Sequence, residues 1–136
     1  ILGRDPRQCD ILLELNEISP IHCKITINAI DDYTIEDMGS EHGVFKYNRH
    51  YVEDPYQRLR PGKEYELLES KPFYIAGYKS VFVSKRTEEL KKQTKELYKK
   101  ISFSMKGGIV FVLVHSYKNS TFRINYLFVL NFKLLN

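Results

Sequence analysis

The chain has 136 residues, two cysteines and a formal net charge of +4 at pH 7. This length allows one domain of ordinary size, whose core needs neither disulfide nor metal to stabilise it. Cys9 and Cys23 belong to no CxxC pair and to no Cys/His set with ligand spacing, so we expect no zinc site and no cofactor. Two free thiols favour a reducing compartment, nuclear or cytosolic.

The basic charge lies at the end of the chain. Residues 1–85 hold 11 basic and 14 acidic side chains, whereas residues 86–100 have a net charge of +3 and residues 101–136 a net charge of +4. A mildly acidic body followed by a basic segment is not the pattern of a nucleic-acid-binding face, so we expect no nucleic-acid binding by the body. We also expect no membrane span, because no apolar run approaches the ~20 residues that a span needs.

The first 85 residues have the pattern of an all-β domain. Ile1 and Leu2 resemble the end of a strand already in progress, which predicts a domain truncated at its N-terminus. Short runs with a two-residue period or an apolar character then predict strands at 11–15, 22–28, 33–37, 44–45, 65–68, 73–76 and 80–83. Residues 46–58 are polar and aromatic and predict a long loop. Many short strands with frequent turns favour an antiparallel β-sandwich.

After residue 85 the pattern changes twice. Residues 86–100 are strong helix formers with a narrow apolar stripe, which predicts a short charged helix or linker that leaves the domain. Residues 101–136 are apolar and basic and contain no acidic residue. This tail is left unassigned between two alternatives: a β-hairpin that needs a sheet to join, or a segment that is not native folded protein.

Three short clusters within residues 1–43 carry the functional signal. They are Gly3-Arg4, Ser19-Pro20-Ile21-His22 and Gly39-Ser40-Glu41-His42-Gly43. All three fall at predicted strand ends or in loops, where a β-sandwich carries its binding groups. An arginine donates two parallel hydrogen bonds to an anion, and serine hydroxyls add further donors. The clusters therefore predict recognition of a phosphate group without its cleavage.

These clusters resemble the forkhead-associated (FHA) domain family over residues 1 to about 84. The resemblance is carried by Gly3-Arg4, Cys9-Asp10-Ile11, Ile18-Ser19 with His22, Ile35 to Ser40, Gly43-Val44-Phe45, Leu59 to Gly62 and Phe73 to Gly77. It implies an eleven-stranded β-sandwich, here without its first strand, whose loops bind phosphothreonine peptides. The loop and turn patterns look somewhat like those of DNA-damage checkpoint mediators. The resemblance thus implies a nuclear signalling adaptor whose partner is a phosphorylated protein, or a segment of its own parent chain.

The resemblance also assigns roles to single residues. It places Arg4, Ser19, Ser40, Glu41 and His42 at phosphopeptide-contacting positions. It makes the remaining residues of the motif structural supports of the site: Gly3, His22, Gly39 and Gly43.

Four residues depart from the family pattern. His42 stands where the family usually has an asparagine, and Glu41 stands where a small hydroxyl residue is common. Pro20 follows Ser19 and offers no N–H donor, and Glu17 adds a negative charge ahead of the loop. A carboxylate close to a phosphate dianion is repulsive. These departures predict a partly degenerate phosphate site.

The departures leave a second function open. The domain could be an interaction module that has lost phosphopeptide binding and forms homodimers through a sheet face, with Tyr47, Tyr51 and Tyr56 as contact area. An enzyme is not expected. His22 and Cys23 are neighbours on a strand, so their side chains point to opposite faces and cannot act as base and nucleophile.

Overall fold

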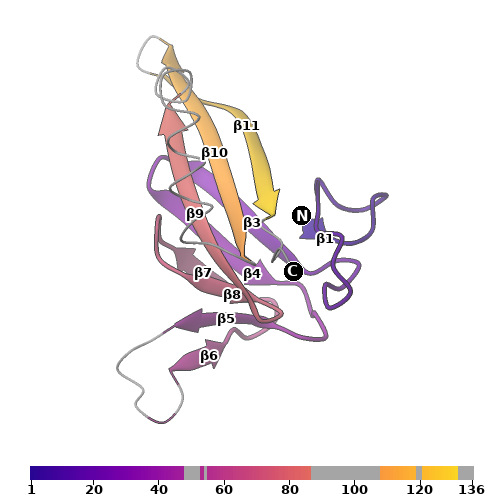
Figure 1. The fold of residues 1–136 in the computed structure, drawn as a ribbon. Coiled ribbons are helices and arrows are strands. Elements are labelled where there is room, and N and C mark those ends of the chain that lie inside the picture. The colour runs from indigo at the N-terminus through magenta and orange to yellow at the C-terminus, as the bar shows by residue number, and fades with distance from the viewer. Residues whose placement is uncertain (48–52, 54, 87–107, 119–120, 132–136) are drawn as a thin grey trace.

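The structure is a computed structural model that describes residues 1–47, 53, 55–86, 108–118 and 121–131. For residues 85, 114, 117–118 and 121–131 it describes the backbone alone. The regular structure of these residues is all β, arranged in two sheets (Figure 1). The prediction of an all-β fold is confirmed. No helix in this part of the chain is long and apolar enough to cross a membrane.

The first sheet has five strands in the order β2-β1-β3-β4-β7. Their bounds are Leu2–Gly3 for β1, Ile11–Leu12 for β2, Cys23–Ala29 for β3, Asp32–Asp37 for β4 and Glu64–Leu67 for β7. The strands predicted at 22–28 and 33–37 are confirmed as β3 and β4, which form an antiparallel pair with Ile25 opposite Ile35. Alternation buries Tyr33 and Ile35 on the face that meets the second sheet.

The second sheet has six strands in the order β11-β10-β9-β8-β5-β6. Their bounds are Val44–Tyr47 for β5, Tyr56–Arg58 for β6, Phe73–Ile75 for β8, Tyr78–Arg86 for β9, Ile109–Lys118 for β10 and Thr121–Asn131 for β11. The segment predicted as a loop, residues 46–58, contains the end of β5 and all of β6, so that prediction is wrong for residues 46–47 and 56–58. All three residues of β6 are exposed, which leaves no apolar alternation to mark the strand.

Both sheets are mixed, which corrects the prediction of an antiparallel sandwich. Strand β1 pairs in parallel with β2 through Leu2 and Ile11, and β9 pairs in parallel with β10 through Ser80 and Ile109. The other strand pairs described are antiparallel. Parallel neighbouring strands are joined by crossover connections rather than tight turns, so no local turn motif in the sequence predicts their pairing.

The last two strands give a structure to part of the tail that the sequence left unassigned. β10 and β11 form an antiparallel hairpin that extends the second sheet beside β9 (Figure 1). Of the two alternatives, the structure therefore has the hairpin joined to a sheet. Of the helix predicted over residues 86–100, Arg86 is the last residue of β9. Residues 87–100 lie outside the described part of the chain.

The core lies between the two sheets. Its buried side chains include Leu2, Tyr33, Ile35 and Leu67 from the first sheet and Val44, Phe73, Ile75, Phe82, Ile109, Phe111 and Leu113 from the second. The rings of Tyr33 and Phe82 meet across the sandwich with centroids 4.6 Å apart. Phe111 of β10 stacks on Phe73 of β8 at 5.9 Å. The hairpin therefore shares one core with the body.

Candidate functional site

A buried histidine connects the two loops that carry the predicted site. His22 has no exposed surface. Its Nδ1 accepts the backbone N–H of Ser19 at 3.1 Å, and its Nε2 lies 2.9 Å from the carbonyl oxygen of Gly43. Because a carbonyl only accepts, Nε2 carries the proton and the ring is the neutral Nε2–H tautomer. Burial lowers the pKa of His22, which favours the same neutral form.

Ser19 lies where the two loops meet. Its Oγ accepts the backbone N–H of Glu41 at 3.0 Å, from the opposite loop. The hydroxyl proton is not used by this bond and is available to an oxygen of a ligand. Ser19 is half-buried, so the group is both positioned and accessible.

Arg4 comes to the same place from the N-terminal segment. Its Nε donates to the carbonyl oxygen of Ile18 at 3.0 Å, and its backbone N–H donates to the carbonyl oxygen of Ser19 at 3.1 Å. The guanidinium is held through Nε, which leaves both Nη groups for a ligand. The side chain is exposed, and no ion pair among the described residues neutralises it. The structure thus fixes a cation on the loop that carries Ser19.

Gly3 allows the close approach between the Arg4 segment and the Ser19 loop. A Cβ atom at Gly3 would lie 2.3 Å from the carbonyl oxygen of Pro20, a distance that the backbone cannot accommodate without moving. The same carbonyl accepts the backbone N–H of Asp5 at 3.1 Å and the thiol of Cys9 at 3.0 Å. Gly3 therefore supports the site by geometry, without reaching a ligand.

The loop over residues 39–43 is a tight turn with internal hydrogen bonds. Asp37 Oδ1 accepts the backbone N–H of Ser40 at 2.9 Å, and Ser40 Oγ accepts the backbone N–H of Gly43 at 3.0 Å. Gly39 and Gly43 have φ values of 85° and 82°, in the left-handed region. Ser40 is only 5% exposed, so its hydroxyl lies inside the turn. Its predicted contact with a phosphopeptide stays a prediction.

Arg58 is a member of this region that the sequence patterns do not reveal. Its Nη2 donates to the carbonyl oxygens of Ser40 and Glu41 at 3.1 and 3.3 Å. Its Nε also occupies the space that a Cβ at Gly43 would enter, at 2.7 Å. Arg58 lies in β6, opposite Phe45 in β5. Only that register brings it to the loop, and no local motif signals it.

An acidic side chain lies at the rim of the site. Glu17 accepts the hydroxyl of Tyr78 at 2.5 Å, and this bond lowers the pKa of the Glu17 carboxyl and raises the pKa of the Tyr78 hydroxyl. The charge of His42 lowers the Glu17 pKa further. Glu41 and His42 are both exposed. The negative charge predicted ahead of the loop is therefore held in place near the second loop.

Cys23 and His22 are poorly placed for nucleophilic catalysis. Cys23 is fully buried, and burial raises the pKa of its thiol to about 12. A thiol in that environment stays protonated and inert at neutral pH. Both ring nitrogens of His22 are used by backbone groups.

Comparisons with known proteins give a family match for residues 1–67 and a match to one solved structure. The family model for the FHA domain matches residues 1–67. The crystal structure of the FHA domain of CT664 protein from Chlamydia trachomatis is similar to this chain at 27% sequence identity and a TM-score of 0.44, over 57% of this chain and 67% of that one. No curated protein matches the chain. FHA domains are, in general, phosphopeptide-binding interaction modules rather than enzymes. Residues 1–67, which hold the three clusters, His22 and Arg58, belong to the FHA-domain family.

Proposed function

We propose that this chain is an adaptor module that binds a phosphothreonine-containing segment of a partner protein, in a nuclear signalling setting. The observation that supports the proposal most directly is the meeting of Arg4 with Ser19 beside the loop that holds Glu41. The free Nη groups of Arg4 and the Ser19 hydroxyl offer charge-assisted and neutral donors to the phosphate oxygens.

The acidic rim limits how tightly a phosphate can bind. Glu17 directly precedes the loop that carries Ser19, and Glu41 lies on the loop whose backbone donates to Ser19; both are exposed, and a carboxylate close to a phosphate dianion repels it. Arg58 offsets part of this repulsion, because its guanidinium binds the carbonyl groups of the loop that presents Glu41. We therefore propose that the site binds a phosphate group with modest affinity.

The first test removes the cation. Arg4→Ala is expected to weaken binding of a phosphothreonine peptide by about 10- to 100-fold, because a hydrogen bond to a charged group is worth about 1.5–3 kcal/mol. Binding is measured by calorimetric titration, after an array of degenerate phosphothreonine peptides has identified the tightest binder. Arg60→Ala is the matched control, because Arg60 is an exposed arginine whose own described hydrogen bonds use its backbone and join it to Tyr65 and Lys63. Equal affinity of the Arg4→Ala variant, or an array without phosphate-dependent binding, contradicts the proposal.

A second candidate function is self-association through an aromatic face. On the outer side of the second sheet, the rings of Tyr47 and Tyr56 lie 5.5 Å apart and those of Tyr56 and Tyr74 lie 4.9 Å apart, in edge-to-face contacts. Tyr47 and Tyr56 are 47% and 43% exposed. Rigid, half-exposed tyrosines are typical of interface residues. Tyr51, which was predicted to join them, lies outside the described residues.

This candidate makes its own prediction. If the face mediates dimerisation, light scattering shows a molar mass that rises towards the dimer with concentration, and Tyr56→Ser returns the mass to that of the monomer. Tyr65→Ser is a matched control, because Tyr65 lies in β7 of the other sheet. A monomer mass at every concentration contradicts dimerisation and leaves the phosphopeptide proposal unaffected.

A further inference from the structure

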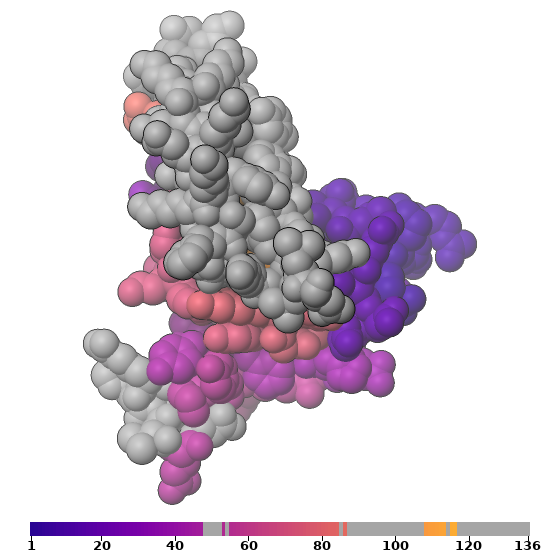
Figure 2. All heavy atoms as spheres, in the orientation of Figure 1, coloured from indigo at the N-terminus to yellow at the C-terminus, as the bar shows by residue number. Residues whose placement is uncertain are grey.

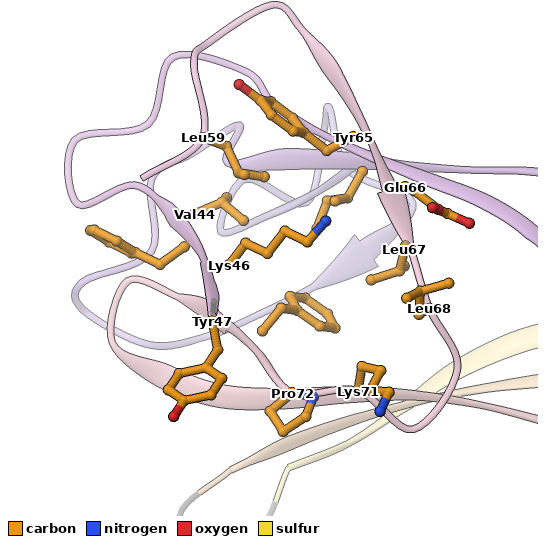
Figure 3. Close-up of a pocket in the computed structure, with 13 residues that line it drawn as sticks. Val44, Lys46, Tyr47, Leu59, Tyr65, Glu66, Leu67, Leu68, Lys71 and Pro72 are labelled. Carbon is orange, nitrogen blue, oxygen red and sulfur yellow. The ribbon is translucent and has the colours of Figure 1, made fainter. Parts of the chain in front are cut away.

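A cavity between the two sheets is not used by the phosphate site. It measures about 140 Å³ and opens between β5 and β7, the edge strand of the first sheet. Its lining includes the buried apolar residues Ile35, Val44, Leu59, Leu67 and Phe73. Figure 3 labels Val44, Leu59 and Leu67 among them. A dry cavity of ~150 Å³ holds a group as large as a benzene ring. The space therefore suits one aromatic or large aliphatic side chain.

This cavity lies apart from the N-terminal segment that carries Arg4. Figure 2 shows that segment projecting at one side of the molecule, while β5 and β6 lie at its lower end. The cavity is lined by residues of β4, β5, β7 and β8 and the turns beside them, whereas the phosphate site is formed by the loops at residues 3–5, 18–22 and 39–43. A ligand in the cavity would thus make a second, separate contact.

A lysine faces this apolar space. Lys46 is on the same side of β5 as the buried Val44, and it pairs with Phe73, which is 5% exposed. Core-facing positions of a sandwich are normally apolar, because an unpaired charge is costly to bury. Figure 3 shows the Lys46 side chain extending from β5 across the cavity towards β7. The residue remains exposed, so its charge is accessible at the mouth of the cavity.

The charges at the mouth favour an anionic ligand. Lys71, in the turn between β7 and β8, is a second exposed lysine on the lining. Glu66 also lines the cavity, but Figure 3 shows its carboxylate on the far side of β7, directed away from the space. No ion pair among the described residues involves Lys46 or Lys71. The mouth therefore combines an apolar pocket with two accessible cations.

We propose that this cavity is a second peptide-binding site, for an extended acidic segment of a partner protein that inserts one aromatic or large aliphatic side chain. The side chain fills the apolar pocket, and carboxylates on the same face of the segment bind Lys46 and Lys71. Side chains two residues apart on an extended chain point to the same face, at a spacing of ~6.6–6.8 Å. The edge strand β7 offers its backbone to such a segment, as in other complexes where a peptide adds to a sheet.

The inward position of Lys46 has a second explanation, and the test must distinguish it from ligand binding. Lysines near sheet edges, and charges that point inward, protect edge strands against pairing with other chains. In that case Lys46 would limit aggregation and would bind no ligand. The two explanations differ in whether a carboxylate improves binding at the cavity.

The experiment titrates the full chain with three blocked pentapeptides and follows the methyl signals of Val44 and Leu67 by NMR. The peptides are Glu-Ala-Phe-Ala-Glu, Gln-Ala-Phe-Ala-Gln and Lys-Ala-Phe-Ala-Lys, each acetylated and amidated. We expect saturable shifts with the acidic peptide, about fivefold weaker binding of the neutral one and no detectable binding of the basic one. The preference should decrease at high salt, because both lysines are exposed.

Lys46→Met tests the origin of this preference, because methionine keeps an unbranched apolar side chain and removes the charge. We expect it to lower the affinity of the acidic peptide to that of the neutral one. Lys79→Met is the control, because Lys79 is exposed on β9 and does not line the cavity. The proposal is overturned if no peptide shifts these methyl signals, if the neutral peptide binds as tightly as the acidic one, or if Lys46→Met changes nothing. Phosphopeptide binding is not involved in any of these outcomes.

Discussion

Replacement of His22 by alanine is expected to destabilise the protein by about 3 kcal/mol and to abolish phosphopeptide binding. The ring is fully buried and satisfies two backbone groups, the N–H of Ser19 and the carbonyl of Gly43. Without it the N–H of Ser19 loses its partner, at a cost of about 1–3 kcal/mol, and the Gly43 carbonyl keeps only the backbone N–H of Ala76. The lost packing of the buried ring adds to this cost. The same change releases the two loops from each other, so the Ser19 hydroxyl loses its fixed position.

His42→Ala is the matched control for stability, since His42 is an exposed histidine on the same loop as Gly43. Its free energy of unfolding, measured by urea denaturation, should lie within about 0.5 kcal/mol of the original chain. His22→Gln is a milder variant that keeps a donor and an acceptor, and it should recover part of the lost stability. A His22→Ala protein as stable as the His42→Ala protein contradicts the bridging role.

The buried ring also predicts a dependence of stability on pH. Burial lowers the pKa of His22 in the folded protein, so the unfolded chain binds a proton at a higher pH than the folded chain does. Stability from this group is therefore complete above the unfolded pKa of about 6.5 and declines as the pH falls below it towards the folded pKa. The His22→Gln variant should lack this part of the decline. The lowered pKa of Glu17 contributes to acid unfolding only at lower pH, below its ordinary value of 4.5.

Removal of the C-terminal hairpin is expected to have the largest effect on folding. Ile109, Phe111 and Leu113 of β10 have no exposed surface and belong to the core. Each buried side chain of this size contributes about 1.5–3 kcal/mol, so three together approach the total stability of about 5–15 kcal/mol of an ordinary domain. The chain cut after Arg86 should therefore show no cooperative thermal transition. β9 would also become an unpaired edge of nine residues, which favours aggregation.

A point variant tests the same contact without truncation. Phe111→Ala is expected to lower the free energy of unfolding by about 3–5 kcal/mol, because it removes the ring that stacks on Phe73 and leaves a cavity. Met38→Ala is the control, since Met38 is 40% exposed. If residues 1–86 alone unfold cooperatively at the temperature of the full chain, the hairpin is not part of the folding unit.

Local alternation predicts the strands whose inward residues are apolar. The predicted ranges 22–28 and 33–37 differ from β3 and β4 by one residue at their ends, and 65–68 differs from β7 in the same way. Alternation does not predict strand β6, because all three of its residues are exposed. The apolar runs of β10 and β11 can be recognised in the sequence. The strand that β10 joins cannot, because β9 is separated from β10 by residues 87–108. Pairing between strands so far apart in the sequence depends on how the whole core packs, which local patterns do not record.

The same difference between local patterns and contacts distant in sequence applies to the predicted site. The order of the three clusters predicts that Arg4 and Ser19 come together, and the structure brings them together. His22, which is predicted to support the site, contacts one backbone group in each of the two loops. Arg58 and Tyr78 were not predicted, because each reaches the site from a strand that is distant in sequence. A motif records residues that are close along the chain, whereas these contacts depend on the register of the sheets.

The parallel pairing of β9 with β10 also determines when the fold can be completed during synthesis. The three loops and Arg58 of the predicted site are translated first, but the core lacks Ile109, Phe111 and Leu113 until β10 has also been made. At ~5–20 residues per second, the ribosome needs about 3–10 s to cover that distance. During this interval the second sheet lacks β10 and β11, so the nascent chain presents apolar core side chains to the surrounding solution. We therefore expect the core to close, and the loops at residues 18–22 and 39–43 to become fixed, only after translation has passed Leu113.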